Sequence, residues 1–358
     1  MKTIFIIADF CANYPGNFVS SLATLENKMI DKWHFVYFFA RGESEQFLSW
    51  YSEFEKKHDA HLIYFCDAGA AEVTGYVHRL EPDCLYFHFG GMSFPISVYR
   101  KLYCGEKRRI KFLYHLHSRP NEGKGAKDKA KLLFSRLLCP PTLSFVASCN
   151  EFKEIIEKNY PNRKTYFSPN RVDFSRLKFN CGKNFDGSPK SALTFCYDYR
   201  VKGGDYAAAI AKKLHEAHND FHLFMVVASH REMIEEQLRN DFPDYKDYIS
   251  ILGPSSDISS IYALSNIYLL PSRTESLNYS VVEASYSGLT VVASDLPSIR
   301  EIKLPRIKTF ATGGGIKKAV DIIEECFRTE PQIASKRDYD EYSLDKWIDV
   351  ETQIIEGL

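Results

Sequence analysis

PSRTESLNYSVVEASYSGLTVVASD, residues 271–295, is the stretch that decides the fold. The run IYLLPS that leads into it predicts a strand ending at Pro271, and SVVEASYS predicts a helix that Gly288 closes. A second apolar run, TVVAS, follows as another strand. Two nearly all-apolar strands joined by a helix are typical of a parallel sheet that is covered on both faces.

The same alternation runs through the rest of the chain. The strand-like runs of the first half are TIFIIA, WHFVYFFA, HLIYFC, CLYFHF, KFLYHLH and LSFVAS, and LTFCYD, FHLFMVVA and YISILG follow later. Between the two sets, over residues 170–190, the pattern fails and Gly, Asn, Pro and Ser collect. We expect an α/β protein with two doubly wound parallel-sheet domains, residues 1–170 and 171–341, facing each other across a cleft. A C-terminal helix is expected at about residues 342–358, after the second domain. One option is that it packs against the first domain.

Composition excludes several classes of protein. The 358 residues hold 46 Lys and Arg against 46 Asp and Glu, and this balance argues against a nucleic-acid partner. The nine cysteines form no C-x-x-C pair, which predicts free thiols in a reducing compartment and no structural zinc. The opening MKTIFIIADF is too short an apolar run for a signal peptide, and no run approaches the roughly 20 residues of a membrane span. We therefore expect a cytoplasmic protein.

Two glutamates stand out in the opening stretch. Glu275 lies in the loop at the carboxyl end of a predicted strand, and Glu283 lies in the first turn of the helix that follows. The space above a helix N-terminus favours anions, so carboxylates there call for a ligand other than phosphate, and vicinal sugar hydroxyls fit. Two alternatives stay open. Ser280-x-x-Glu283 is also a capping box, and Glu275 alone is often a solvated loop carboxylate.

The stretch resembles the E-x7-E signature of the family-4 retaining glycosyltransferases, whose fold, GT-B, has two facing Rossmann-like domains. The matching residues are Pro271, Ser272, Glu275, Glu283, Ala284, Gly288 and Val291 to Asp295. The resemblance implies that Glu283 binds the ribose hydroxyls of a nucleotide donor and that Glu275 faces the donor sugar. The family's Gly-Phe-Gly is replaced by Ser276, Leu277 and Asn278, which keep the backbone N–H donors for the diphosphate and are expected to narrow the sugar pocket.

FCYDYRVKGGDY resembles the family's Gly-Arg…Lys-Gly segment. Lys202 and Gly203 align with its Lys-Gly, which implies that Lys202 neutralises the leaving diphosphate. The family's arginine falls on Tyr197, and Arg200 is a substitute from its own position. The alternative for both Lys202 and Arg200 is an ordinary charge on the protein surface.

The first half carries two weaker resemblances. KFLYHLHS resembles the strand whose histidine touches the donor sugar, which implies that role for His117, with His115 on the same face as the alternative. A core or surface histidine is the structural alternative. NYPGN resembles the glycine loop under the donor phosphate, with one glycine, Gly16, where two are usual.

Residues 100–136 hold twelve Lys and Arg against three Asp and Glu. Such a stretch in the first domain, the presumed acceptor domain, predicts a surface that rests on anionic lipid. In it, KDKAKLLFSRLL presents Leu132, Leu133 and Phe134 beside the charges. The alternative is a solvated basic face.

The resemblance predicts a retaining, metal-independent glycosyltransferase of the hexosyltransferase type that needs no cofactor. The donor is a nucleoside-diphosphate sugar, with a UDP-sugar favoured, and the acceptor is a glycan or lipid-linked glycan of a surface polysaccharide pathway. We expect a cytoplasmic protein, with the option of a peripheral place on the inner face of the cell membrane. Asp338-Tyr339-Asp340 matches a metal-binding D-x-D but is interpreted as a solvated tail. The alternatives are a nucleotide-sugar epimerase or hydrolase of the same fold and a non-catalytic sugar-nucleotide-binding module.

Overall fold

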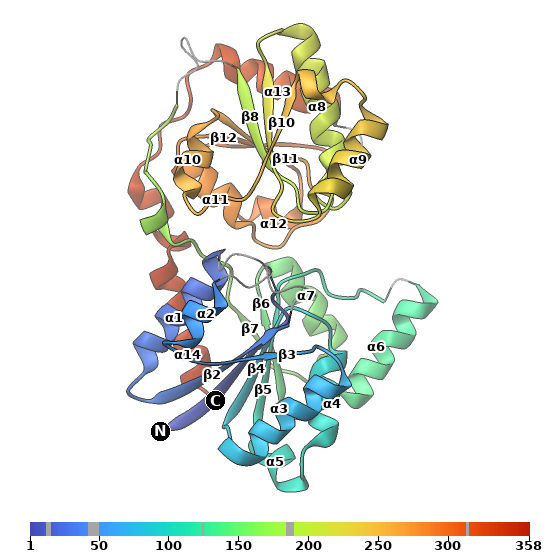
Figure 1. Cartoon of the computed structure of the whole chain (residues 1–358), viewed down its shortest axis with the longest axis vertical. Coiled ribbons are helices and arrows are strands. Elements are labelled where there is room, and N and C mark those ends of the chain that lie inside the picture. The colour runs from blue at the N-terminus through green and yellow to red at the C-terminus, as the bar shows by residue number, and fades with distance from the viewer. Residues whose placement is uncertain (12–15, 42–49, 124, 184–189, 313–314) are drawn as a thin grey trace. The chain divides into compact units, whose positions relative to one another are not determined.

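The structure is a computed structural model that describes residues 1–11, 16–41, 50–123, 125–183, 190–312 and 315–358. The chain divides into two compact units (Figure 1). Unit 1 comprises Met1–Pro169 and Trp347–Leu358, and unit 2 comprises Asn170–Lys346. The last residues of the chain therefore belong to the unit that its first residues form.

Unit 1 is built on a parallel seven-stranded sheet in the order β3-β2-β1-β4-β5-β6-β7. The strands are β1 Lys2–Ala8, β2 Trp33–Ala40, β3 Asp59–Ile63, β4 Cys84–His88, β5 Lys111–Leu116, β6 Leu143–Ala147 and β7 Thr165–Phe167. The helices are α1 Gly16–Met29, α2 Tyr51–Glu55, α3 Asp67–Leu80, α4 Ser93–Lys101, α5 Cys104–Arg109, α6 Ala126–Leu138, α7 Asn150–Asn159 and α14 Leu344–Glu356. In Figure 1, α1, α2 and α14 cover one face of the sheet, and α3, α4 and α7 cover the other.

Unit 2 is built on a parallel six-stranded sheet in the order β10-β9-β8-β11-β12-β13, which is the Rossmann order. The strands are β8 Ser191–Phe195, β9 His222–Val226, β10 Ile249–Leu252, β11 Ile267–Leu270, β12 Thr290–Ser294 and β13 Ile307–Phe310. The α-helices are α8 Gly204–Ala217, α9 Arg231–Asp241, α10 Ile258–Ala263, α11 Tyr279–Tyr286, α12 Pro297–Arg300 and α13 Ile316–Arg328. Short 3-10 helices are η2 Phe174–Arg176, η3 Tyr245–Asp247 and η4 Lys336–Tyr342.

Each sheet has a switch point, where the order of strands reverses along the chain. It lies between β1 and β4 in unit 1 and between β8 and β11 in unit 2. Ligands of doubly wound sheets bind outside the carboxyl ends of the strands at such a point. The loops after β8 and β11 carry Lys202 and Glu275, whereas His88 ends β4 and His117 follows β5. The predicted candidates Lys202, Glu275 and His117 thus follow the carboxyl ends of strands, and His88, which was not predicted, ends the strand next to β5.

The opening stretch of the sequence folds as its pattern predicts. β12 is TVVAS, and all five of its residues are buried. Gly288 closes α11 with a φ of +93°, and a Cβ there would lie 2.8 Å from the Cβ of Asn180. Only glycine accepts this backbone without strain, so α11 turns directly into β12.

The sequence pattern did not predict every element of the fold. The short strands β7 and β13 lie at one end of their sheets and were not predicted. The segment SEQFLSWYSEFEKKH, residues 44–58, has a helical pattern, but only α2 within it is described, because residues 42–49 lie outside the described residues. Asp338 is exposed as expected, but it belongs to η4, where its carboxylate accepts a hydrogen bond from the Ser335 N–H at 2.8 Å. This carboxylate caps a helix, and the intervening Tyr339 is buried.

All nine cysteines lie in the described part of the chain, and none of them forms a disulfide bond there. Among the described helices, none combines the length and the apolar character that a membrane crossing requires.

Candidate functional site

The loops after β8 and β11 are tied together at the switch point of unit 2. The Arg273 N–H donates to the Val201 carbonyl at 2.9 Å, and Nη1 of Arg273 donates to the Arg200 carbonyl at 2.5 Å. Gly203 has a φ of +68°, and a Cβ there would lie 2.1 Å from the carbonyl oxygen of Pro271. A larger residue would force the loops apart, so Gly203 permits their contact.

This contact brings Lys202 and Glu275 together. Nζ of Lys202 lies 2.7 Å from Oε1 of Glu275, and the two side chains are 10% and 6% exposed. Burial by itself lowers the pKa of Lys202, but the Glu275 carboxylate and Tyr197, whose ring centre lies 4.6 Å from Nζ, raise it above its ordinary value. The pair is therefore ionic and nearly enclosed. Glu275 is not a solvated loop carboxylate.

Arg200 is engaged elsewhere. Its Nη1 donates to Oδ2 of Asp205 at 2.7 Å, and Arg273 binds the same carboxylate through Nη1 at 2.9 Å and Nη2 at 2.7 Å. Burial alone would raise the pKa of Asp205, but the two guanidinium groups hold it below its usual value. The guanidinium of Arg200 is thus partly neutralised at the start of α8, and its role as a substitute for the family's arginine stays a prediction.

Glu283 is a buried carboxylate on α11. The Tyr262 hydroxyl of α10 donates to its Oε2 at 2.8 Å. The helix begins at Tyr279, and its N-cap is Asn278, whose Oδ1 accepts from the Ser280 N–H at 2.9 Å. Because Ser280 is not the N-cap, the capping-box alternative for Glu283 is wrong.

Glu275 and Glu283 act on one common hydroxyl, that of Tyr268 on β11. Burial raises the pKa of Tyr268, the hydrogen bond with Ser280 opposes this, and the charges of both glutamates raise it further. The Tyr268 hydroxyl lies 2.6 Å from Oγ of Ser280. The charges of the two carboxylates therefore both act at the Tyr268 hydroxyl.

The loop residues between the glutamates differ from expectation. Leu277 packs in the core of unit 2, and its carbonyl accepts a hydrogen bond from Nδ2 of Asn170 at 3.0 Å. Asn278 caps α11, so neither side chain is left to narrow a sugar pocket. Within the described residues, the N–H groups of Ser276 and Leu277 donate to no protein group. They remain available as donors to an anionic ligand.

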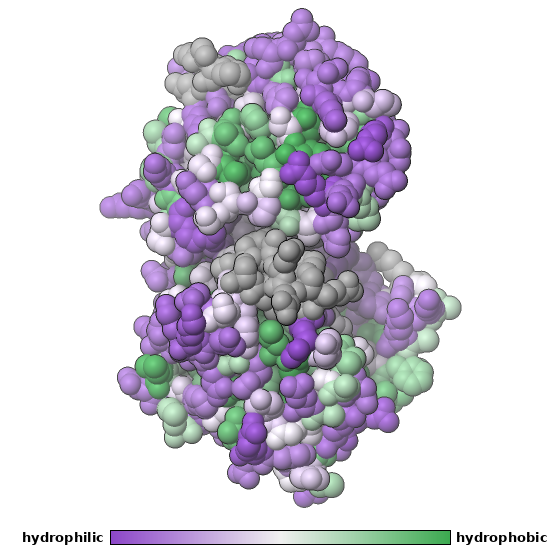
Figure 2. Space-filling model, viewed as in Figure 1, coloured by the Kyte–Doolittle hydropathy of each residue, from purple (hydrophilic) through white to green (hydrophobic). Residues whose placement is uncertain are grey.

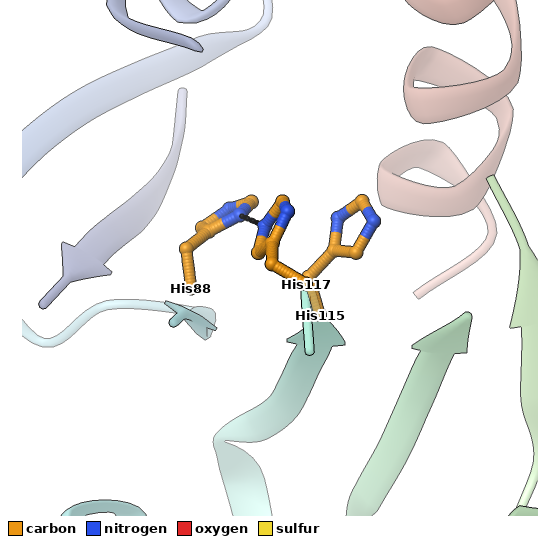
Figure 3. Close-up of side chains that lie close together, drawn as sticks. All are labelled: His88, His115 and His117. Atoms are coloured by element: carbon orange, nitrogen blue, oxygen red, sulfur yellow. Dashed lines mark hydrogen bonds between the residues drawn. The ribbon is translucent and has the colours of Figure 1, made fainter. Parts of the chain in front are cut away.

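Unit 1 presents three histidines at the carboxyl edge of its sheet (Figure 3). Nδ1 of His88 lies 3.1 Å from Nε2 of His117, and the His115 ring stacks on that of His117 with centroids 4.3 Å apart. Burial lowers the pKa of His115 to about 3. Burial and the neighbouring histidines lower the pKa values of His88 and His117 well below the ordinary value. All three rings are neutral at physiological pH.

Neutral rings define the direction of the hydrogen bond between His88 and His117. Nε2 of His88 is buried and has no partner among the described residues. An unpaired buried N–H is rarer than an unpaired acceptor, which favours the proton on Nδ1 of His88 and donation to Nε2 of His117. His117 then carries its own proton on Nδ1.

Three histidines this close together are also a candidate metal site. Their closest nitrogens lie within 4.8 Å of one another. A metal ion must lie near the plane of every imidazole that binds it, but the stacked His115 and His117 rings are inclined by only 22°. Nitrogens of two stacked rings do not converge on one ion. As placed, the cluster packs by stacking and hydrogen bonding.

His115 is tied to a buried carboxyl group on α14. Its Nδ1 lies 3.0 Å from the Tyr86 hydroxyl, which donates to Oε2 of Glu351 at 2.8 Å. Oγ of Ser168 donates to Oε1 at 2.5 Å. Burial raises the pKa of Glu351 to about 7, although both hydroxyls lower it. Since His115 is held inside unit 1, His117, which lines a cavity, is the better placed of the two predicted histidines.

The remaining predicted elements are only partly described. Gly16 is the first residue of α1 and has a φ of +55°, but residues 13–15 of NYPGN lie outside the described residues. Residues 100–136 include α5, the buried strand β5 and α6. Leu132 packs partly against the core, whereas Leu133 and Phe134 are 57% and 65% exposed.

Comparisons with known proteins bear on this geometry. Residues 192–317, which hold Lys202, Glu275 and Glu283, match the family described as "Glycosyl transferases group 1". Anabaena HepE in complex with UDP aligns over all of both chains with a TM-score of 0.75 and 15% identity. The fold is GT-B.

Two curated relatives align with parts of this GT-B chain. An uncharacterized glycosyltransferase of Haemophilus influenzae is 33% identical over 116 residues, which are 32% of each protein. An uncharacterized 41.2 kDa protein in the cps region of Klebsiella pneumoniae is 22% identical over 230 residues, or 62% of each. The aligned parts therefore span less than two thirds of either relative.

The Lys202–Glu275 pair generates a prediction for stability. Lys202→Met leaves a nearly enclosed carboxylate without its partner and should lower the free energy of unfolding by about 3 kcal/mol. Lys202→Met/Glu275→Gln should recover part of that loss, with a coupling of at least about 1 kcal/mol in urea titrations. Lys212 and Asp244, an exposed pair at the same 2.7 Å, are the control and should lose little. If the losses of unfolding free energy in Lys202→Met and Glu275→Gln simply added up in the double variant, the two side chains would not interact, and the ion pair would be contradicted.

Glu351 generates a prediction for pH. Its folded pKa of about 7 exceeds the unfolded value of 4.5, so the folded chain holds an extra proton between them. The stability that this provides is complete below pH 4.5 and is lost as the pH rises to about 7, with a slope of at most about 1.4 kcal/mol per pH unit. The buried histidines have lowered pKa values, so their contribution to stability increases as the pH rises. They are present in both wild type and Glu351→Gln, so this contribution cancels when the two proteins are compared. The stability of wild type relative to this variant should therefore fall over this window, and a constant difference would exclude the raised pKa.

Proposed function

We propose that the chain is a retaining, metal-independent glycosyltransferase that moves a hexose from a UDP-sugar to a glycan or lipid-linked glycan. The enclosed Lys202–Glu275 pair at the switch point of unit 2 carries this proposal, with Glu283 close by on α11. The matched family segment includes all three residues. HepE has been solved with UDP and with UDP-glucose, which supports a uridine nucleotide as the donor.

Each group in unit 2 has a proposed part in donor binding. Glu283 accepts hydrogen bonds from the ribose hydroxyls while Tyr262 keeps its carboxylate oriented. The N–H groups of Ser276 and Leu277 donate to the diphosphate. Glu275 accepts from hydroxyls of the transferred sugar. Carboxylates suit the sugar hydroxyls, and amides suit the phosphates.

Lys202 changes partner when the donor binds. In the structure its charge is balanced by Glu275 at 2.7 Å. A diphosphate beside Nζ attracts the ammonium more strongly as the bond to the sugar breaks, because negative charge then grows on the leaving oxygen. Preorganised cations in a dry site stabilise such charge effectively. Glu275, released from Lys202, is then free to hold the sugar.

Transfer with retention requires no group on the enzyme to form a covalent bond. The acceptor hydroxyl attacks C1 from the face that the diphosphate leaves. The new C1–O bond forms as the C1–O bond to phosphate breaks, and the hydroxyl proton passes to the departing phosphate. Nδ1–H of His117 is proposed to donate to a hydroxyl of the transferred sugar.

The acceptor side of the proposal rests on unit 1. The Klebsiella relative is described as a protein in a cps region, which supports a role in surface polysaccharide synthesis. The basic α6 with its exposed Leu133 and Phe134 supports a peripheral contact with anionic lipid on the cytoplasmic face of the membrane.

A donor panel tests the function directly. UDP-sugars should raise the Tm of the full chain, whereas UDP alone should do so less, and nucleotide sugars of other bases least. Transfer to an acceptor extract should continue unchanged in excess EDTA. Release of free sugar at the same rate with and without acceptor would point to a hydrolase, and the absence of any nucleotide response would contradict the proposal.

Glu283→Gln separates donor binding from folding. The amide keeps an oxygen for the Tyr262 hydroxyl but loses the charge that the ribose hydroxyls require. Calorimetry should show UDP binding weakened by about 1.5–3 kcal/mol, or about ten- to a hundredfold, with the Tm nearly unchanged. Glu232→Gln, on the exposed start of α9, is the matched control. Normal UDP affinity in Glu283→Gln would assign Glu283 a structural role only.

A further inference from the structure

Unit 1 contains a cavity of about 1310 Å³, and of its lining residues only His117 has a part in the proposed donor chemistry. It lies between α4, α6 and the segment after β5. Its apolar lining includes Met92, Ile96, Leu116, Leu132, Leu138 and Phe145. The volume exceeds the roughly 300–1,000 Å³ that is typical of sites for drug-sized ligands. The cavity therefore has room for a long apolar group.

Three cations stand at the same cavity. Arg100, Lys127 and Lys131 line it, and none of them forms a salt bridge within the described residues. Lys127 and Lys131 are four residues apart on α6, so their side chains share one face of the helix. Three cations without a salt-bridge partner beside an apolar lining favour an anionic group attached to a hydrocarbon.

The other charges at the cavity are already balanced. Asp67 accepts from Oγ of Ser97 at 2.6 Å and from Nζ of Lys101 at 3.0 Å. Arg119 lies 2.7 Å from each of its two partners, Glu122 and Glu151. Arg100, Lys127 and Lys131 therefore provide the excess positive charge.

Helix α6 extends the apolar lining to the surface. None of its residues is buried. Phe134 lines the cavity and is also exposed, and Leu137 on the same helix is 73% exposed. In the space-filling view, pale green and purple residues lie side by side where Figure 1 shows α6 (Figure 2). A hydrocarbon chain longer than the cavity can continue along this helix without leaving apolar contacts.

We propose that the cavity binds a phosphorylated lipid, with its chain against Ile96 and Leu132 and its phosphate at Arg100, Lys127 and Lys131. Lysine and arginine bind phosphate through charge-assisted hydrogen bonds, and burial of the chain adds the hydrophobic contribution. His117 lines the same cavity, so the glycan end of the lipid lies beside it. This makes the lipid the acceptor, a step that rests on the proposed function, whereas the cavity and its charges do not.

Soluble probes separate the two parts of the ligand. Farnesyl monophosphate, a short prenyl phosphate, should bind the full chain saturably in calorimetry, with about one probe per chain. Farnesol, which lacks the phosphate, and inorganic phosphate, which lacks the chain, should each bind at least about tenfold more weakly. Equal binding of farnesol, or of inorganic phosphate, would overturn the proposal.

Matched variants locate the site. Lys127→Ala/Lys131→Ala and Ile96→Glu should each weaken farnesyl monophosphate binding at least about tenfold. Arg108→Ala/Lys111→Ala removes the same charge from exposed positions of the basic stretch that do not line the cavity, and it should bind normally. The same loss in this control would show non-specific attraction and would overturn the assignment.

Vesicles distinguish the cavity from a membrane surface. Leu137→Glu should reduce co-sedimentation with phosphatidylglycerol vesicles but leave farnesyl monophosphate binding intact, whereas Ile96→Glu should do the reverse. If Leu137→Glu abolishes both, the surface alone binds lipid. If the chain sediments as a dimer and no probe binds, α6 packs against a second copy of the chain, and the lipid proposal is overturned. UDP-sugar binding is measured in the wild type and in every variant. A wild-type chain that binds UDP-sugar but not the probe overturns only the cavity assignment, whereas a wild-type chain that binds no UDP-sugar overturns the proposed function.

Discussion

The ion pair between Lys202 and Glu275 is the interaction on which the candidate site depends. Each residue lies in a loop at the carboxyl end of a strand, and β8 and β11 are neighbours although 71 residues lie between Phe195, which ends β8, and Ile267, which begins β11. Glycine at position 203 allows the loops to touch, and the pair then balances two charges in a nearly enclosed place. Because enclosure strengthens electrostatic interactions, the same lysine can stabilise an anionic ligand once its carboxylate partner turns to another group.

Unit 1 differs from unit 2 because the titratable groups at the edge of its sheet are neutral and not ion-paired. Its histidines are neutral because burial disfavours their charged forms, and the Glu351 carboxyl beside them has a raised pKa for the same reason. Neutral rings can stack and can hold one defined proton between His88 and His117. A charged cluster would need counterions or water. Most of the basic residues of the stretch 100–136 instead lie outside the sheet, on α4, α5 and α6.

The sequence patterns were most informative where one strand, one helix or one loop sufficed. The apolar runs predicted both sheets, and the spacing of Glu275 and Glu283 placed both carboxylates at one sheet edge. They failed where a distant residue was decisive. Asn278 rather than Ser280 caps α11, and Leu277 enters the core, because Asn170 and the interior of unit 2 hold this loop. Tyr262, the partner of Glu283, carries no local signal, since it lies 21 residues earlier in the chain.

The apolar pattern of the chain alone predicts the two parallel sheets, because nearly continuous apolar strands can only be buried on both faces. It also predicts which loops carry candidate charges, because a helix or strand boundary is a local property. How those charges are used depends on contacts between distant residues. Arg200 pairs with Asp205, His115 with Tyr86, and Lys202 with Glu275, and each choice depends on which side chains the sheets bring within hydrogen-bonding distance. Burial, which sets the protonation of Glu351 and the histidines, is likewise a property of packing.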